Sequence, residues 1–251
     1  MEQGSAVDWQ ALKETYAAEF GVSPAVHPDD FLWKFIVGLA VFPQPEDAAR
    51  FYFSDGAQSA QKLLAIVSER IQGRYSLLEF ASGYGMVTRH LPRALPEAEI
   101  TSCDIHRQAM SFIRDEFGVA TMLSEHFPEQ LNVDRRYDVV FALSFFSHMP
   151  EATFGRWLRR LWDLVDDGGI FVFTTHGAES VKNFVNPEVS AAGFWFMPLS
   201  EQSDLDEREY GSTISLPPFV LKELSNFTNS ADVQFSGAHW WGHQDLYVVP
   251  K

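Results

Sequence analysis

The sequence has few cysteines and few positive charges. Cys103 is the only cysteine among 251 residues, so an internal disulfide and a multi-cysteine metal site are both excluded. Lysine and arginine together number 19, against 34 aspartate and glutamate residues, and the formal net charge is −15. Because binding to nucleic acid needs a basic surface, this balance argues against a nucleic-acid partner.

Long apolar runs are also missing. The most apolar early segment, residues 31–42, is shorter than the roughly 20 residues that span a bilayer, and it contains Lys34. Residues 1–4 lack the basic region that begins a signal peptide. We therefore expect a cytoplasmic protein with no membrane partner, long enough for one sizeable α/β domain with insertions.

The strongest local concentration of positive charge is formed by Arg156, Arg159 and Arg160. These arginines alternate with apolar residues at helical spacing, which places them on the polar face of an amphipathic helix. We interpret them as a solvated helix face.

The most informative segment is residues 77–86, Leu-Leu-Glu-Phe-Ala-Ser-Gly-Tyr-Gly-Met. It is typical of a buried strand that enters a glycine turn, with a helix beginning near Met86. Gly83 and Gly85 allow backbone N–H groups to approach a ligand, and the helix N-terminus favours a negative group there. The next predicted strand ends at Asp104, whose carboxylate can accept both hydroxyl groups of a ribose. The two features predict a nucleoside site, although Asp104 could instead cap the helix that begins at His106.

The pattern around the glycine turn distinguishes between classes of nucleoside ligand. A dinucleotide fingerprint has a third glycine, but position 88 is a threonine. With Glu79 in the strand, the pattern is instead acid-x-small-x-Gly-x-Gly, and it resembles motif I of the class I S-adenosylmethionine-dependent methyltransferases. The resemblance continues in register over residues 75–177, and it includes the C-terminal strands. It departs at Ala81, where many members have glycine, so the cofactor approach is possible but tighter.

This resemblance implies S-adenosylmethionine as the cofactor and assigns its contacts residue by residue. Asp104 is assigned to the ribose. Glu79 is assigned to the methionine end; alternatively, it is a carboxylate at the end of a strand that is hydrogen-bonded to the backbone. The remaining assignments divide among three parts of the cofactor: Glu79, Ala81, Ser82, Gly83 and Gly85 at the methionine end, Ile105 with Ser124 or Glu125 at the adenine, and Leu143 and Ser144 under the sulfonium.

Two histidines are candidates for catalysis. A sulfonium methyl group is already a strong electrophile, so the enzyme has to orient the acceptor, exclude water and, for some acceptors, remove a proton. His176 ends the fifth predicted strand and has either a substrate or base role or a structural one. His148 follows the fourth strand, and the alternative for it is that its side chain pins the loop. No spacing of histidines and carboxylates indicates a metal site, and none is expected.

The order of predicted elements indicates an α/β fold. Helices are expected over 9–20 and 31–41, followed by a turn at 52–56 and a helix over 57–71. Strands over 76–81, 98–105, 119–124, 137–143 and 170–175 then alternate with helices, and strands over 233–240 and 246–250 form a hairpin. This predicts a doubly wound, mostly parallel seven-stranded sheet with a C-terminal antiparallel hairpin.

Two further parts complete the predicted organisation. Residues 1–72 form an N-terminal helical cap, and residues 73–251 form a Rossmann-like methyltransferase domain. Residues 178–216 have no long helical period and follow the fifth strand, so a lid or small hairpin is expected there. The resemblance implies that the cap closes over the cofactor and helps to form the substrate pocket. From its irregular pattern and its position, the lid is expected to gate the acceptor pocket together with the cap.

The predicted function is methyl transfer from S-adenosylmethionine to an oxygen or nitrogen atom of a small or medium-sized acceptor. An alternative is a module that binds the cofactor or a partner without turnover. A third hypothesis, an NAD(P)-dependent oxidoreductase, is disfavoured by the missing third glycine and by the C-terminal hairpin.

Overall fold

The predicted strands of the main sheet are all present in the computed structural model, which describes residues 7–200, 202 and 204–251. Residues 1–4, on which the expected lack of a signal peptide rests, lie outside this range. The seven strands are β1 (Tyr75–Phe80), β2 (Ala98–Asp104), β3 (Ala120–Leu123), β4 (Tyr137–Ala142), β5 (Val165–His176), β8 (Gln234–Trp240) and β9 (Gln244–Pro250).

The strand order confirms the predicted fold class. The sheet has the order β3-β2-β1-β4-β5-β9-β8. The pairs β2–β3, β1–β4 and β4–β5 are parallel, whereas β5–β9 and β8–β9 are antiparallel. β5 begins five residues before its predicted start, because Val165 pairs with Tyr137 across a register shift. The terminal antiparallel hairpin is therefore part of a mostly parallel sheet.

The chain divides into two compact units, and the first consists of Met1–Arg70 and Ser82–Leu123. Asp8 and Asp30 cap its first two helices, each accepting a hydrogen bond from a backbone N–H three residues on. Besides β2 and β3, the unit contains α1 (Trp9–Phe20), α2 (Phe31–Gly38), α3 (Pro45–Ser68), the 3-10 turn η1 (Thr88–His90), α4 (Leu91–Ala94) and α5 (Arg107–Phe117).

The turn predicted at 52–56 is wrong, because α3 continues through it without a break. Tyr52 and Phe53 are fully buried on this helix. A Cβ atom at Gly56 would lie only 2.2 Å from the carbonyl oxygen of Met86. Gly56 is thus explained by close packing of the helix against residues 86–90 and not by a bend. The helix expected near Met86 also starts later, as the 3-10 turn at Thr88.

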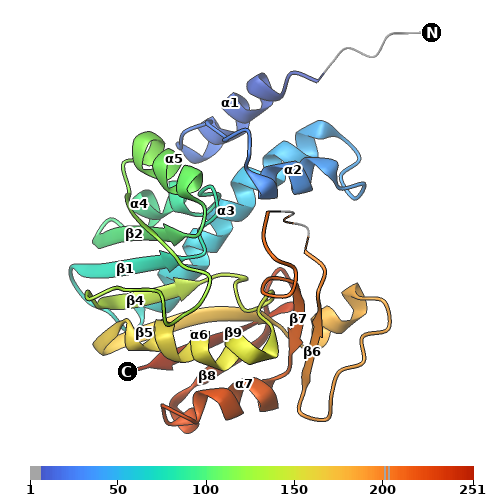
Figure 1. Cartoon of the computed structure of the whole chain (residues 1–251). Coiled ribbons are helices and arrows are strands. Elements are labelled where there is room, and N and C mark those ends of the chain that lie inside the picture. Colours follow the sequence, from blue (N-terminus) through green and yellow to red (C-terminus); the bar gives the residue numbers. More distant parts are fainter. Residues whose placement is uncertain (1–6, 201, 203) are drawn as a thin grey trace. The chain divides into compact units, whose positions relative to one another are not determined.

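The second unit consists of Ile71–Ala81 and Ser124–Lys251. In it, α6 packs against β5 and lies beside α7 (Figure 1). Besides β1, β4, β5, β8 and β9, the unit contains α6 (Glu151–Asp163), the 3-10 helix η2 (Ala178–Asn183), β6 (Phe194–Met197), β7 (Ser212–Ser215), α7 (Pro217–Leu224) and the 3-10 turn η3 (Ser230–Asp232).

The segment predicted as a lid or hairpin contains the antiparallel pair β6–β7, with Phe194 opposite Ser215 (Figure 1). β7 is tied to the loop after β4: the Thr213 N–H donates to the Ser147 carbonyl at 2.8 Å. The Thr213 hydroxyl donates to the Met149 carbonyl at 2.6 Å. The hairpin is therefore fixed to the loop that carries His148. Among the described helices, none is long and apolar enough to cross a membrane.

Candidate active site

The glycine turn of the first unit is bonded directly to the end of β2. Gly83 and Gly85 have φ values of +55° and +82°, which favour glycine. The Gly83 N–H donates to one oxygen of the buried Asp104 carboxylate at 2.8 Å. The other Asp104 oxygen accepts the His106 N–H at 3.0 Å and lies 2.7 Å from Nδ1 of the same histidine. Asp104 therefore organises the turn and also accepts the N–H at the start of α5, and its oxygens retain acceptor capacity.

The same turn has the features of a polar ligand site. The Ser82 hydroxyl oxygen is buried and has no hydrogen-bond partner among the described residues. A Cβ atom at Gly83 would meet nothing within 4 Å, whereas one at Gly85 would lie 2.7 Å from the Phe117 ring. The two glycines thus serve different purposes, since Gly85 allows internal packing and Gly83 borders open space. An orphaned hydroxyl next to a glycine that borders open space fits the polar end of a cofactor.

The assigned residues of the second unit differ in exposure. Glu79 is buried on β1, and Ser124 is buried next to the exposed Glu125. Ile105 of the first unit is half-buried, as are Leu143 and Ser144 of the second. Their contacts with a cofactor stay predictions.

Ala81 has the strained conformation that glycine would relieve. Its φ is +59°, in the left-handed region that costs a non-glycine residue roughly 1–2 kcal/mol. Ala81→Gly is expected to raise the free energy of unfolding by about 0.5–1 kcal/mol, because part of the relief is offset by the freer unfolded chain. Urea denaturation measures this. The matched control is Ala120→Gly in an ordinary strand position of β3, which should lower stability by about as much. A loss in both variants would contradict strain at Ala81.

A closed ring of hydrogen bonds holds Ser144, which has a φ of +60°. The Ser144 N–H donates to the Thr174 hydroxyl at 2.8 Å. That hydroxyl donates to Oε1 of Gln244 at 2.7 Å, and Nε2 of Gln244 donates to the Ser144 hydroxyl at 2.8 Å. Thr174 and Gln244 are buried. The ring fixes the backbone where β4 ends, at a conformation that few serines adopt.

The hydrogen bonds between Ser144 and Ser147 fix the direction in which each hydroxyl donates. The Ser147 hydroxyl donates to the carbonyl oxygen of Ser144, which can only accept. The contact of 2.8 Å between the two hydroxyls must therefore be a donation from Ser144 to Ser147. Sequence reasoning missed Thr174 and Gln244, because their partners lie 30 to 100 residues away in the chain. It also missed the role of Ser147, although its partner Ser144 is only three residues away.

Both candidate histidines are anchored through Nδ1 in the second unit. His148 bonds the Gly211 carbonyl at 2.8 Å, and its ring stacks on Tyr210 with centroids 4.4 Å apart. His176 bonds the Thr213 carbonyl at 3.1 Å. Because a carbonyl only accepts, each Nδ1 carries a proton, and the basic lone pair of the neutral ring is at Nε2. For His176, Nε2 has no hydrogen bond to any described residue. The structure thus brings the histidines together, with ring centroids 6.5 Å apart.

His176 is neutral at physiological pH. Burial above all, and then the nearby His148 and His243, lower its pKa to about 3, against the opposing effect of the hydrogen bond to the Thr213 carbonyl. The Phe184 ring lies 5.5 Å from the imidazole. His176 can therefore accept a hydrogen bond over the whole neutral range, but it is a weak base.

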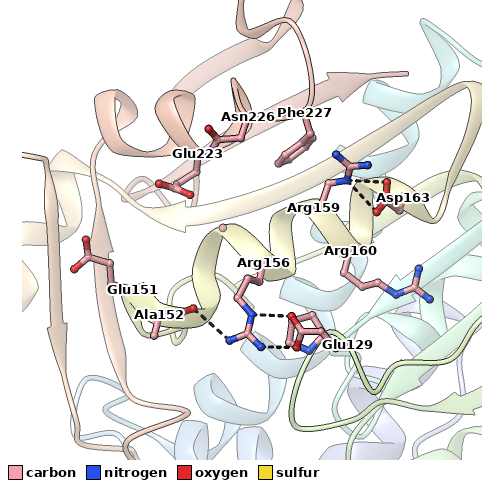
Figure 2. Close-up of a pocket in the computed structure, with 12 residues that line it drawn as sticks. Glu129, Glu151, Ala152, Arg156, Arg159, Arg160, Asp163, Glu223, Asn226 and Phe227 are labelled. Carbon is pink, nitrogen blue, oxygen red and sulfur yellow. Dashed lines mark hydrogen bonds and ion pairs between the residues drawn. The ribbon is translucent and has the colours of Figure 1, made fainter.

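The three arginines singled out in the sequence lie in the wall of a pocket of about 510 Å³ formed by α6, α7 and the loop at 128–129 (Figure 2). Arg156 pairs with Glu129, and Arg159 pairs with Asp163 at 2.9 Å (Figure 2). Arg160 donates to the Leu131 carbonyl at 2.7 Å. The positive charges are thus engaged within the protein, and no predicted site residue is among the described residues that line this pocket.

Within the described part of the chain, no group of three His, Cys, Asp or Glu side chains could hold a metal ion.

Comparisons with known proteins agree with the fold and with the motifs of the glycine turn. Residues 78–171 match the family model of a methyltransferase domain. No curated sequence matches the chain.

Three solved structures illustrate the shared fold. An S-adenosylmethionine-dependent methyltransferase from Clostridium acetobutylicum is 12% identical, over 79% of this chain and 91% of that chain, with a TM-score of 0.53. A putative O-methyltransferase from Nostoc punctiforme is 17% identical, over 94% and 71%, with a TM-score of 0.55. A complex of DhpI with SAH is 18% identical, over 88% and 95%, with a TM-score of 0.53. At these identities the likeness concerns the fold alone.

Proposed function

Because this chain carries a class I S-adenosylmethionine-dependent methyltransferase domain, we propose that it transfers the sulfonium methyl group to an oxygen or nitrogen atom of a small or medium-sized acceptor. The observation that carries the proposal is the glycine turn bonded to Asp104, with an unsatisfied Ser82 hydroxyl and open space at Gly83. S-adenosylmethionine supplies an electrophilic methyl group that needs no metal for activation.

In this proposal, the first unit holds the polar ends of the cofactor. The Ser82 hydroxyl would bond the polar methionine end of the cofactor, and Asp104 would accept from the ribose hydroxyls while it keeps its bond to Gly83. The resemblance adds Glu79, Ala81, Leu143 and Ser144 to the cofactor residues.

The second unit supplies the groups that handle the acceptor. Nε2 of His176 accepts a hydrogen bond from the acceptor hydroxyl or amine and so orients its lone pair. As the methyl group arrives, a hydroxyl oxygen becomes strongly acidic, so that even a weakly basic imidazole can take its proton. His148 holds the loop next to β7 through Gly211. The cap over 1–72, the lid over 178–216 and a cytoplasmic location belong to the same proposal.

The cofactor assignment has a direct test in Asp104→Ala. The variant should bind S-adenosylhomocysteine about 1.5–3 kcal/mol more weakly in calorimetry, because hydrogen bonds to a charged group are lost. The matched control is Asp115→Ala, which removes an exposed carboxylate of α5 that pairs with Arg114 at 2.8 Å. The control should bind like the wild type.

Two outcomes would overturn the assignment. Unchanged affinity in folded Asp104→Ala would remove the ribose role, and tight binding of NAD in place of S-adenosylhomocysteine would favour an oxidoreductase. Methyl transfer from S-adenosylmethionine to any small acceptor separates the enzyme from a module that binds the cofactor without turnover.

A further inference from the structure

A buried arginine directly follows the glycine turn. Arg89 is only 5% exposed, although guanidinium groups are almost always charged. Its Nε donates to the Gly85 carbonyl at 3.2 Å. Its Nη1 donates to the carbonyls of Ser23 and Ala25 at 3.0 and 2.9 Å. One side chain therefore bonds the last peptide of the turn and two peptides of the segment between α1 and α2.

The charge of this arginine is compensated through a tyrosine. Nη2 of Arg89 donates to the Tyr52 hydroxyl at 3.0 Å, and this hydroxyl donates to Asp30 at 2.6 Å. The other Asp30 oxygen accepts the Trp33 N–H and so caps α2. The guanidinium carbon also lies 4.9 Å from the centroid of the Phe117 ring. The chain Arg89–Tyr52–Asp30 thus connects the turn to the start of α2.

A second contact joins the same two parts of the chain. The His27 ring stacks on Tyr84, with centroids 4.7 Å apart and planes at 20°. Tyr84 lies between Gly83 and Gly85 in the turn, and it is buried. Residues 22–30 contain no helix or strand, so contacts of this kind fix their conformation.

We propose that Arg89 is a positioning residue that couples residues 22–30 to the cofactor turn. Cofactor binding then stabilises the seated conformation of residues 22–30, and seating of this segment strengthens cofactor binding by the same factor. The reason is that the Gly85 carbonyl is shared by the Arg89 side chain and backbone N–H, the latter at 3.2 Å, so the turn and the segment move as one hydrogen-bonded body. The inference rests on the proposed function only in the identity of the ligand.

Hydrogen exchange of the wild-type protein, with and without S-adenosylhomocysteine, tests the coupling without any mutation. Peptides that cover residues 22–30 should exchange about tenfold more slowly in the complex, as well as those of the turn. If S-adenosylhomocysteine binds but slows hydrogen exchange only in the turn, the coupling is overturned and the proposed function is left intact. Failure of the wild type to bind would overturn both.

Variants then test whether the Arg89 side chain carries the coupling. Arg89→Lys keeps the charge but loses the forked donors, so affinity for S-adenosylhomocysteine should fall about tenfold and the ligand-induced slowing at residues 22–30 should disappear. The control is Arg93→Lys: the guanidinium of Arg93 is exposed and donates to the Phe20 carbonyl at 3.0 Å, away from the turn, and the variant should bind within about twofold of the wild type.

Stability is measured beside affinity, because a merely structural arginine would lower the unfolding temperature and leave the affinity of the folded fraction unchanged. That result would overturn the proposal. If Arg89→Lys does not fold, His27→Ala removes the ring from Tyr84 without leaving a buried charge. It should weaken binding about three- to tenfold, and wild-type affinity in this variant would count against the coupling.

Discussion

Replacing His176 by alanine is expected to lower kcat about 10²-fold or more and to leave the affinity for S-adenosylmethionine nearly unchanged. General bases contribute about 10²–10⁴-fold, and a weak base belongs at the lower end of that range. The acidic limb that His176 contributes to kcat should lie near its pKa of about 3, because the imidazole must be unprotonated to accept. Steady-state kinetics between pH 5 and 8 should thus show no limb from this residue.

Two further variants are needed to tell proton transfer by His176 from orientation of the acceptor. His176→Gln keeps a hydrogen-bond acceptor but cannot take a proton, so recovery of kcat in this variant would show that His176 orients the acceptor. His126→Ala is the control, since His126 is exposed and its nearest partner, Glu209, is 3.7 Å away. A loss of less than about threefold in His176→Ala would contradict both roles.

Acidification should destabilise the protein through a histidine that takes no part in the proposed chemistry. Burial, followed by the charge of Arg89, lowers the pKa of His90 from 6.5 to about 4. The unfolded state therefore binds a proton below pH 6.5, whereas the folded state binds it only near pH 4, and stability falls as the pH falls through this window. From pH 7 to pH 4 the loss from His90 is about 3 kcal/mol. Urea denaturation across this range measures it.

Other buried groups modify the total. His176 contributes in the same direction, because its pKa is also lowered. Asp30 contributes in the opposite direction, because its pKa is raised and it therefore favours the folded state as the pH falls. Burial raises this pKa, whereas the hydrogen bonds from Tyr52 and Trp33 and the charge of Arg89 lower it. His90→Leu isolates the first contribution, since its pH dependence should be flatter by about 3 kcal/mol than that of the wild type. The exposed control, His126→Leu, should keep the wild-type slope, and an equally steep slope in His90→Leu would refute the explanation.

The sequence predicts this fold well because its signals are local. Alternating strands and helices, the glycine turn and the terminal hairpin each occupy a short stretch, and the structure has all of them, although α3 begins at Pro45 and not at residue 57, and β5 begins at Val165 and not at residue 170. The cap of α2 is equally local, because Asp30 and its partner Trp33 are three residues apart. The exception is Gly56, whose reason for being glycine is the carbonyl of Met86, 30 residues further along the chain.

The site was predictable only in part. The turn at Gly83 and the acid at Asp104 follow recognisable strands, so both could be named from the sequence. In the sequence, Arg89 cannot be told from an ordinary polar residue, because its role depends on the carbonyls of Ser23 and Ala25, more than 60 residues away. Histidines 148 and 176 could be placed at strand ends, but the depressed pKa of His176 comes from burial and from neighbours that only the folded chain brings together.

The ring around Ser144 has a consequence for the order in which the protein assembles. Gln244 is 100 residues from Ser144 and 70 from Thr174, so two large loops must close before all three side chains can meet. β4 and β5 can pair earlier, but the strained serine gains its last donor only when β9 is added beside β5. The turn that leads to His148 is therefore expected to reach its final geometry late in folding, as one of the slowest parts of this unit to mature.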